Sequence, residues 1–419
     1  MKKTISTLIA LISALSMTAA DYILTEYGVK VDSTKVQTAA IQKVIDRAEA
    51  DGGGRIVVPA GTFLSGALFF KPGTTLHLEK NACIKGSDNI SDFPLIPSRM
   101  EGRSIYYYAA LINAYHVDGF SITGPGTVNG NGLKYWKQFW NLRKERRKEG
   151  RSCTNLEVHR PRLVFIWGCD NVCLDGPTLC NSPFWTTHFY QCNGIEIANC
   201  RITAPREPVR APSSDAIDLD VCSDVHIHDC YLNCDDDGVC LKGGKGVYAN
   251  VSGENGVVKN VLVERCVFGP NLHGALTLGS ECIHATDIII RDCEVATGSA
   301  LLRLKMRPDT YQVYENIQVR NITGYCGSVI DMKPWTQFFD LEGSDLKPYG
   351  IVRNIQMENI DVDCQSLGII SGNPLDKVSD IVLKDITVRA SRPGFECAYP
   401  EVKLENVTMN GEQVSNPAI

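Results

Sequence analysis

The chain has 419 residues, of which 44% are hydrophobic and 21% charged, a composition that excludes a disordered or collagen-like protein. Its formal net charge of −6 disfavours non-specific nucleic-acid binding through a global basic field. A chain of this length usually forms two or more domains, and only a repeat architecture makes it a single unit. The 17 cysteines are an odd number, so at least one thiol lies outside any intramolecular disulfide.

The first twenty residues have the pattern of a secretory signal peptide. Two lysines precede an apolar run over 5–17, and small residues follow at 18–20. This run is shorter than a membrane span, and no later apolar run approaches about 18 residues. We therefore predict a signal peptide at 1–20, export to the periplasm or the exterior, and no membrane span.

A capping helix is expected next, over about 36–50, inside an N-terminal cap at about 21–55. Asp32 or Ser33 is the candidate N-cap, and the glycines at 52–54 would end the helix. Its apolar face consists of Ile41, Val44, Ile45 and Ala48. Such a helix would cover the open end of the repeat structure described below, where core and strand edges are otherwise exposed.

Residues 131–162 form a basic insertion with ten Lys or Arg residues, three acids, Trp136 and Trp140. Two interpretations remain open for it. It is either a solvated helical excursion or a lid-like segment that closes one end of a cleft and attracts a polyanion.

One short phrase recurs through the second half of the chain. It reads Asn or Asp, then alternating apolar residues, then Asn or Asp followed by Cys or an aliphatic residue. Clear copies are NGIEIANC (193–200), DVHIHDC (224–230), NVLVERC (260–266), DIIIRDC (287–293), NIQVRNI (316–322), NIQMENI (354–360), DIVLKDI (380–386) and EVKLENV (401–407). Period-two alternation indicates strands, and the Asn, Asp and Gly residues between the copies suit turns.

These repeats predict an all-β, single-domain, right-handed parallel β-helix over 21–419. Equivalent positions from Ile195 to Val402 are 21 to 38 residues apart, so loops of unequal length leave the coils. A leucine-rich repeat is the competing solenoid, but its Leu/Asn pattern is absent. Four cysteines occupy one column of the repeat and are expected to replace small interior hydrophobes: Cys200, Cys230, Cys266 and Cys293.

A second strand column lies between the copies of the phrase. Its aligned positions are Leu219, Leu241, Leu278, Leu304 and Met332, and their spacing follows the first column from the second step onward. Because side chains alternate along a strand, the flanking residues should point outward on one face. These residues are Asp218, Asp220, Cys240, Lys242, Thr277, Gly279, Arg303, Lys305, Asp331 and Lys333.

The same alignment gathers three carboxylates and an imidazole on this face. Asp215 and Asp237 both lie four positions before an aligned leucine, while Asp236 and His273 lie five before. Together with the cations of the column they span about 15 Å over four coils, a plausible floor for an anionic polymer. Two carboxylates flanking a bond can hydrolyse a glycoside, and like charges raise one pKa. Taken singly, each residue also fits a turn, a structural histidine or a solvated surface.

The motifs resemble those of the polygalacturonase family, glycoside hydrolase family 28. The family pattern Asn-Thr-Asp, Gly-Asp-Asp, Gly-His-Gly and Arg-Ile-Lys is matched in order by Ser213-Ser214-Asp215, Asp235-Asp236-Asp237, Leu272-His273-Gly274 and Arg303-Leu304-Lys305. The resemblance implies that Asp236 is the general acid and that Asp215 and Asp237 hold and deprotonate the attacking water. The implied outcome is hydrolysis with inversion.

The resemblance also implies the substrate contacts. His273 would tune the carboxylates, while Arg303 and Lys305 would bind a uronate carboxylate; no metal and no other cofactor is implied. Three motif positions depart from the family pattern, since Asn, Gly and Gly are replaced by Ser213, Asp235 and Leu272. These changes bear on specificity more than on hydrolysis, because every catalytic side chain is retained.

A further segment favours exo-action. Extending the register back 30 residues places Phe189 in the Leu219 column, so that His188 faces outward and Trp185 shares the Asp215 column. The segment 182–188 resembles one in exo-acting members of the family, and His188 and Trp185 are therefore candidate substrate contacts, Trp185 by stacking on a sugar.

We expect an exo-acting bacterial enzyme that acts, as a monomer, on a pectic poly- or oligosaccharide containing galacturonic acid. Arg206 and Arg210 could meet a second substrate carboxylate. Two alternatives use the same fold: a pectate lyase with calcium-binding acids and an arginine base, and a non-catalytic glycan-binding solenoid in which Asp236 is dispensable.

Overall fold

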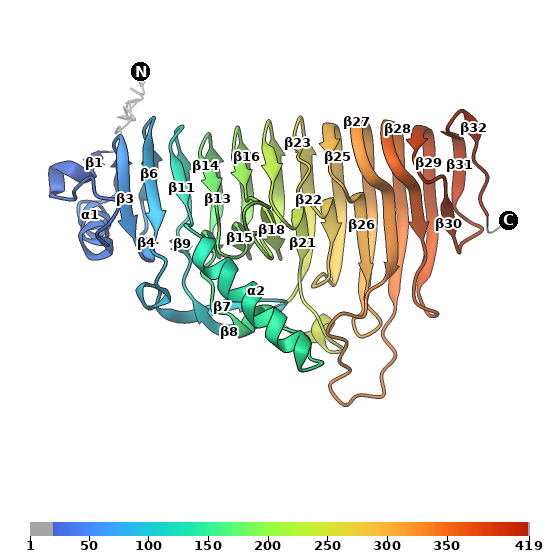
Figure 1. Cartoon of the computed structure of the whole chain (residues 1–419), viewed down its shortest axis with the longest axis horizontal. Coiled ribbons are helices and arrows are strands. Elements are labelled where there is room, and N and C mark those ends of the chain that lie inside the picture. The colour runs from blue at the N-terminus through green and yellow to red at the C-terminus, as the bar shows by residue number, and fades with distance from the viewer. Residues whose placement is uncertain (1–19, 418–419) are drawn as a thin grey trace, which may run out of the picture.

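Short strands stack coil upon coil along residues 20–417, which a computed structural model describes, and the first and last described strands lie at opposite ends of the stack (Figure 1). The predicted parallel β-helix is confirmed, since almost every strand pair is parallel and the strands belong to one continuous ladder system. The predicted signal peptide lies outside the described residues, apart from Ala20. None of the helices in the described part is long and apolar enough to cross a membrane.

Each coil contributes strands to three ladders. The first ladder carries the outward charges of the second strand column: β4 (Leu68–Phe70), β9 (Ile112–Tyr115), β12 (Val164–Trp167), β15 (Thr187–Tyr190), β18 (Ile217–Asp220), β21 (Asp237–Lys242), β24 (Gly274–Leu278) and β26 (Ala300–Met306), continued by β27 (Gln312–Pro334), β28 (Gly350–Ile370) and β30 (Phe395–Cys397).

The second ladder contains the recurring phrase: β1 (Asp21–Ile23), β2 (Gly54–Val58), β5 (Thr74–Leu78), β10 (Ser121–Thr123), β13 (Asp170–Asp175), β16 (Asn193–Ala198), β19 (Ser223–His228), β22 (Val257–Glu264), β25 (His284–Ala296), β27, β28, β29 (Lys377–Ala390) and β31 (Lys403–Met409). The third contains β3 (Gly61–Ser65), β6 (Ala82–Gly86), β11 (Thr127–Asn129), β14 (Thr178–Cys180), β17 (Arg201–Thr203), β20 (Tyr231–Asn233) and β23 (Val267–Phe268), and it joins β25.

The register agrees with the sequence alignment. Ile195 pairs with Val225, and Val225 pairs with Val261. In the first ladder Leu219 pairs with Leu241, which pairs with Leu278. These side chains are buried, so the apolar columns form the core that runs through the inside of the solenoid.

The Asn and Asp residues of the phrase form the bends between strands. Asn316 and Asn354 have φ values of 56° and 52°, a left-handed conformation that Asn tolerates better than most residues. Their side chains also stack from coil to coil, because Asn354 Nδ2 donates to Asn316 Oδ1 at 2.8 Å. The recurring Asn and Asp letters therefore reflect a backbone requirement at the corners.

The predicted cysteine column is buried in the core, and all 17 cysteines are free thiols. In the register, Cys293 is followed by Ile322, as expected for a small interior hydrophobe. A second buried column of Cys169, Cys192 and Cys222 was missed in the sequence, because these residues lie in the bends between phrases.

A thiol count tests this arrangement. We expect the purified chain, unfolded in guanidinium without any reductant, to react with a thiol reagent at 17 sites, because no cysteine is bonded to another. The folded chain should react first at its partly exposed thiols: Cys83, Cys153, Cys173, Cys180 and Cys397. A count that rises only after reduction would contradict the interpretation of these cysteines as core residues.

Helix α1 (Thr38–Ala50) covers the N-terminal end, with the predicted apolar residues buried. The predicted N-cap is wrong: Gln37 occupies that position, not Asp32 or Ser33. Asp32 instead accepts hydrogen bonds from the backbone N–H groups of Thr34 and Lys35, closing a local turn before the helix begins.

Several segments leave the coils. The basic insertion contains α2 (Leu133–Lys148), which crosses one side of the solenoid near the antiparallel hairpin of β7 (Leu95–Met100) and β8 (Arg103–Tyr108) (Figure 1). A long loop between β27 and β28 hangs from the same side (Figure 1). The other short elements are the 3-10 helices η1 (Leu24–Tyr27), η2 (Ile90–Asp92), η3 (Asn155–Glu157) and η4 (Ala249–Val251), and the terminal strand β32 (Glu412–Gln413).

Candidate active site

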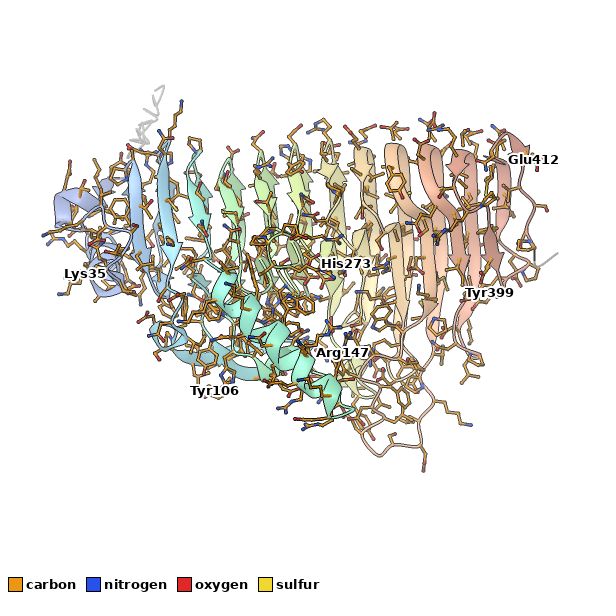
Figure 2. All side chains as sticks on the ribbon, in the orientation of Figure 1. Lys35, Tyr106, Arg147, His273, Tyr399 and Glu412 are labelled. Atoms are coloured by element: carbon orange, nitrogen blue, oxygen red, sulfur yellow. The ribbon has the colours of Figure 1, made fainter. Side chains whose placement is uncertain are left out.

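The predicted carboxylates line one cavity of about 390 Å³, called the cleft below. Its floor is the outer face of the first ladder, and its walls come from α2, the β7–β8 turn and the β27–β28 loop. The predicted site residues that line it are Trp185, Asp215, Asp236, Asp237, His273, Arg303 and Lys305. Figure 2 shows His273 on the solenoid beside α2, which carries Arg147.

Asp237 is held by two cations of β26, which lies two coils further along the solenoid. Lys305 Nζ lies 2.8 Å from its Oδ2, and an Arg303 guanidinium nitrogen lies 3.9 Å from its Oδ1. Burial raises the pKa of Asp237, but the charges of Lys305 and Arg303 outweigh burial and hold this pKa below its ordinary value. Asp237 is therefore an ionised carboxylate at the floor of the cleft.

Asp215 lies beside Asp237 on the preceding coil, as the register predicted. The backbone N–H of Ala216 donates to the carbonyl of Asp237, and a carboxylate oxygen of each aspartate lies within 4.8 Å of the other. Burial, followed by the charges of Asp218 and Asp236, raises the pKa of Asp215 well above its ordinary value. The pair thus combines one ionised carboxylate with one that retains its proton to higher pH.

Asp236 is the accessible member of the three, since 29% of its side chain is exposed. His273 contacts it through Nδ1, 3.3 Å from Asp236 Oδ1, and its other ring nitrogen lies 3.2 Å from Arg210 Nη2. The hydrogen bond to Asp236 is the main reason that the pKa of His273 is raised. A carboxyl that faces open space in a cleft suits a group that must reach a substrate oxygen.

The unusual Asp235 is neutralised inside the protein. Its side chain is fully buried, with Arg206 Nε at 2.7 Å and Arg210 Nε at 2.9 Å. Arg206 and Arg210, which could meet a second substrate carboxylate, both pair with Asp235, and Arg210 also lines the cleft. The additional acid is therefore balanced by two guanidinium groups and does not leave an unpaired charge beside Asp236.

The outward charges of the first ladder do not form an exposed row, which corrects the sequence interpretation. Asp218, Asp220 and Lys242 are buried, because the β7–β8 hairpin and the segment before β12 cover this part of the face. Lys242 Nζ lies 3.3 Å from Asp218 and 3.4 Å from Glu281, and burial raises the pKa of Asp218 to about 7. Asp218, Lys242 and Glu281 therefore form a buried ion-pair network at the cleft floor, which Lys242 and Glu281 line.

His188 is removed from the proposed substrate contacts. It faces outward in register with Asp218, as predicted, but it is fully buried and stacks on Phe165 with ring centroids 5.0 Å apart. Arg162 Nη1 lies 2.6 Å from its Nδ1, and burial lowers the pKa of His188 to about 3. A neutral histidine enclosed by aromatic rings and a guanidinium supports the floor from beneath.

Trp185 lines the cleft but is only 4% exposed. Phe184 stacks on its ring at 5.2 Å, and Lys242 Nζ lies 4.4 Å from its ring centroid. Its predicted stacking on a sugar is not supported by this packing, because neighbouring side chains already cover the indole. Trp185 forms part of the wall.

The remaining walls come from segments whose contacts the sequence did not reveal. Trp140 and Arg143 of α2 line one side, and Phe338 of the β27–β28 loop lines another. Arg103 in the hairpin pairs with Glu342 in that loop at 2.5 Å, so this contact joins two excursions more than 200 residues apart that each contribute residues to the cleft wall. The sequence signal for these walls was the basic insertion at 131–162, for which a lid-like segment at one end of a cleft was one of the two interpretations. Its helix α2 lines the cleft.

The chain is similar to known proteins in sequence and in fold. The family model of glycosyl hydrolases family 28 matches residues 51–408. A probable polygalacturonase of Vitis vinifera is 26% identical over 416 residues, covering 94% of this chain and 80% of that protein. An endo-polygalacturonase of Pectobacterium parmentieri is 24% identical over 371 residues, covering 85% of each. An exopolygalacturonase structure from Thermotoga maritima superimposes with a TM-score of 0.77 at 22% identity, covering 94% and 93% of the chains.

Proposed function

The chain belongs to glycosyl hydrolases family 28, and from this premise we propose that it removes units from one end of a pectic galacturonan with inversion at the anomeric carbon. It is a glycoside hydrolase of the polygalacturonase family, and its substrate is a galacturonan. The pectate lyase and the glycan-binding solenoid are not favoured by this membership.

The observation that carries the catalytic proposal is the set of three carboxylates from two adjacent coils in one cleft. Asp236 is accessible and would protonate the glycosidic oxygen. Asp237, kept ionised by its cations, would take a proton from the attacking water, while Asp215 would help to hold that water. Water attack on the face opposite the leaving group inverts the anomeric centre.

Substrate recognition would rest on the cations of the cleft. Arg303 and Lys305 are only 15% and 12% exposed, but both line the cleft beside Asp237. A uronate carboxylate entering this space would meet two positive charges and the imidazole of His273. An otherwise acidic chain thus concentrates positive charge at the place where an anionic sugar would bind.

The cleft walls support exo-action. α2 lies on one side, and the contact between Arg103 and Glu342 joins the hairpin to the β27–β28 loop. A groove open at both ends lets a long chain pass through, whereas a walled groove favours a chain end. Both endo- and exo-acting proteins are among the relatives, so this part of the proposal rests on the walls.

Product analysis tests the proposal. With saturated galacturonate oligomers of defined length, we expect the released terminal unit and the oligomer shortened by that unit to be the only early products. Proton NMR should show the β-anomer of the new reducing end before mutarotation, because inversion of an α-linkage gives β. Oligomers of several intermediate lengths at early times would refute exo-action, and an initial α-anomer would refute inversion. An unsaturated, ultraviolet-absorbing product would indicate a lyase.

A further inference from the structure

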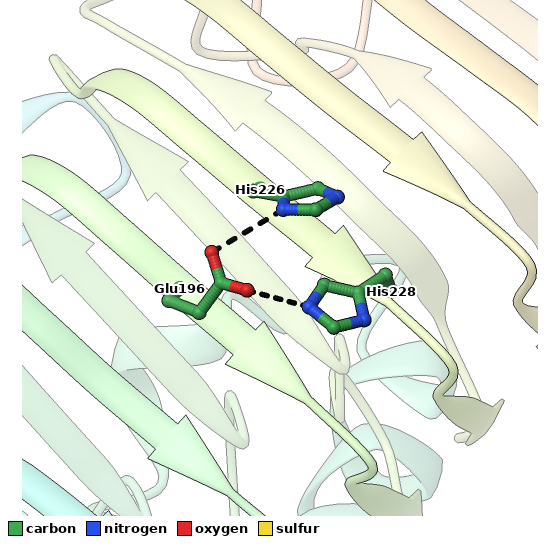
Figure 3. Close-up of side chains that lie close together, drawn as sticks. All are labelled: Glu196, His226 and His228. Atoms are coloured by element: carbon green, nitrogen blue, oxygen red, sulfur yellow. Dashed lines mark hydrogen bonds and ion pairs between the residues drawn. The ribbon is translucent and has the colours of Figure 1, made fainter.

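A second cluster of chemically active side chains lies on a different face from the cleft. Glu196 on β16 is the register partner of His226 on β19, and His228 follows two residues later on the same side of that strand (Figure 3). The two imidazole rings are 4.3 Å apart between centroids. The cluster lies on β16 and β19, and the neighbouring strand is β22. All three strands belong to the second ladder, whereas the cleft lies on the first, so the cluster takes no part in the proposed hydrolysis.

Glu196 lies between the two rings and contacts one nitrogen of each. Its Oε2 is 3.3 Å from His226 Nδ1, and its Oε1 is 2.5 Å from His228 Nε2 (Figure 3). The ligand atoms of the three residues all lie within 4.8 Å of one another. A tetrahedral zinc ion with bonds of about 2.1 Å requires its ligand atoms to be about 3.4 Å apart. Small side-chain rotations would therefore suffice to place an ion among them.

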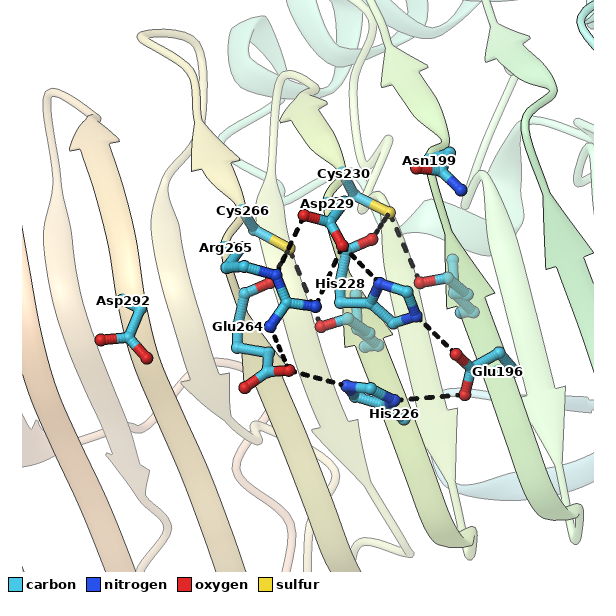
Figure 4. A network of polar contacts seen from close by, with 12 residues as sticks. Glu196, Asn199, His226, His228, Asp229, Cys230, Glu264, Arg265, Cys266 and Asp292 are labelled. Carbon is cyan, nitrogen blue, oxygen red and sulfur yellow. Dashed lines mark hydrogen bonds and ion pairs between the residues drawn. The ribbon is translucent and has the colours of Figure 1, made fainter.

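The other nitrogen of each ring is held by a second carboxylate. His226 Nε2 lies 3.2 Å from Glu264 Oε1, and His228 Nδ1 lies 2.6 Å from Asp229 Oδ2 (Figure 4). In protein metal sites, a ligating histidine usually donates its remaining N–H to such a carboxylate, which directs the lone pair of the first nitrogen toward the metal. Both rings of this cluster have that support.

The supporting carboxylates are themselves fixed by arginines. Arg265 contacts Asp229 at 3.0 Å and also pairs with Glu264 (Figure 4). An Arg291 guanidinium nitrogen lies 2.7 Å from Glu264. These contacts join β19 to β22 and β25, so the rings are oriented by three coils. A histidine and a glutamate that meet by chance on a surface do not require supporting carboxylates and arginines to orient them.

We propose that Glu196, His226 and His228 bind one divalent transition-metal ion of the zinc class. Two imidazoles and a carboxylate are a donor set that suits zinc, leaving a fourth position for water. Their side chains are 43%, 35% and 18% exposed, and Glu196 and His226 line a hollow of about 400 Å³, so an ion can enter from solvent. The metal would join adjacent coils and stabilise the fold, since it binds the folded chain.

A different group of possible ligands shows why this cluster is preferred. Asp215, Asp237 and Cys240 also lie within 4.8 Å of one another, but they line the cleft floor or lie beneath it. Lys305 Nζ already contacts Asp237 at 2.8 Å, so a positive charge occupies the place that a metal would need. Among the described residues, only the histidine cluster offers imidazole nitrogens that face a shared carboxylate.

Calorimetric titration of the full chain with zinc chloride, after removal of metals with a chelator, tests the proposal. We expect one zinc ion per chain. Substituting a proposed ligand (Glu196→Gln, His226→Gln or His228→Gln) should remove the binding or weaken it more than about 100-fold. Asp229→Asn should weaken it by about 10- to 100-fold, the usual effect of losing a supporting carboxylate.

His284→Gln is the matched control. His284 lies on β25 of the same ladder, is 37% exposed and contacts Glu315 at 3.1 Å, but no second imidazole faces that carboxylate. This variant should bind zinc as the parent does, and zinc should raise the melting temperature of both. Circular dichroism and galacturonan hydrolysis verify that each variant is folded, because the cluster lies outside the cleft.

Two results would overturn the proposal. One is a parent chain that takes up no zinc. The other is equal zinc binding by the parent and by the three folded ligand variants, which would place the ion elsewhere. Cobalt gives an independent readout, because a cobalt ion bound by four ligands absorbs visible light strongly, whereas the fully hydrated ion absorbs weakly. The ligand variants should lose that strong absorption.

Discussion

Replacing Asp236 with Asn is expected to lower kcat on a galacturonate oligomer by about 10²- to 10⁴-fold, the usual contribution of general acid catalysis. The amide keeps the size of the side chain but cannot deliver a proton to the leaving oxygen. Initial rates of reducing-sugar release measure the effect. Undiminished activity in a folded Asp236→Asn protein would refute the assignment.

A second substrate separates the roles of the three carboxylates. An aryl galacturonide has a leaving group that departs without protonation, so Asp236→Asn should lose much less activity on it than on the oligomer. Asp237→Asn should lose activity on both, because the attacking water still needs its base. Equal losses for Asp236→Asn on the two substrates would indicate a role other than proton donation.

Asp380→Asn is the matched control for these variants. It makes the same chemical change at an exposed corner, where φ is 54° and Asn is well tolerated. We expect it to retain the activity of the parent on both substrates. A general effect of losing one negative charge would appear in this variant as well.

Replacing Arg99 with Met is expected to lower the free energy of unfolding by about 3–5 kcal/mol, the usual cost of breaking a buried ion pair. Arg99 Nε lies 3.0 Å from Asp220 Oδ2, and both side chains are almost completely buried. Burial raises the pKa of Asp220, but the charge and hydrogen bond of Arg99, together with the neighbouring His188, outweigh burial and lower this pKa. Without the guanidinium, Asp220 would remain as a buried charge beside the neutral His188.

Denaturant unfolding with a check of reversibility measures this loss. Arg55→Met is the control, because the Arg55–Asp21 pair has a similar distance of 2.7 Å but is about 40% exposed. An exposed pair contributes about 0–1 kcal/mol, so the control should change little. The double variant Arg99→Met/Asp220→Asn should regain part of the loss. A loss below about 1 kcal/mol for Arg99→Met would contradict the structural role of this pair.

The register arithmetic succeeded because of the way a parallel solenoid stacks. Each coil lies directly on the one before, so a position counted along the sequence becomes a position in space. Asp215 and Asp237 were placed together in this way, and so were Arg303 and Lys305 above them. The same arithmetic also pairs Glu196 with His226 in the second ladder.

The contacts that form the walls of the cleft could not be predicted from the register of the coils. Trp140, Phe338 and the Arg103–Glu342 contact belong to excursions with no repeat, and their approach depends on how separate loops fold over the coils. His188 shows the same limit, since the register gave its direction correctly, while the segments that bury it lie elsewhere in the chain.

The amino-acid sequence by itself therefore determined the coil, its register and the residues that face outward at the cleft floor, because alternating strands and left-handed Asn and Asp corners are local requirements repeated many times. Only the tertiary structure decided which of those residues are accessible and which charges cancel. Asp235 is neutralised by Arg206 and Arg210, and Asp236 stays open to the cleft. Burial and ion pairing depend on distant segments, so no local pattern encodes them.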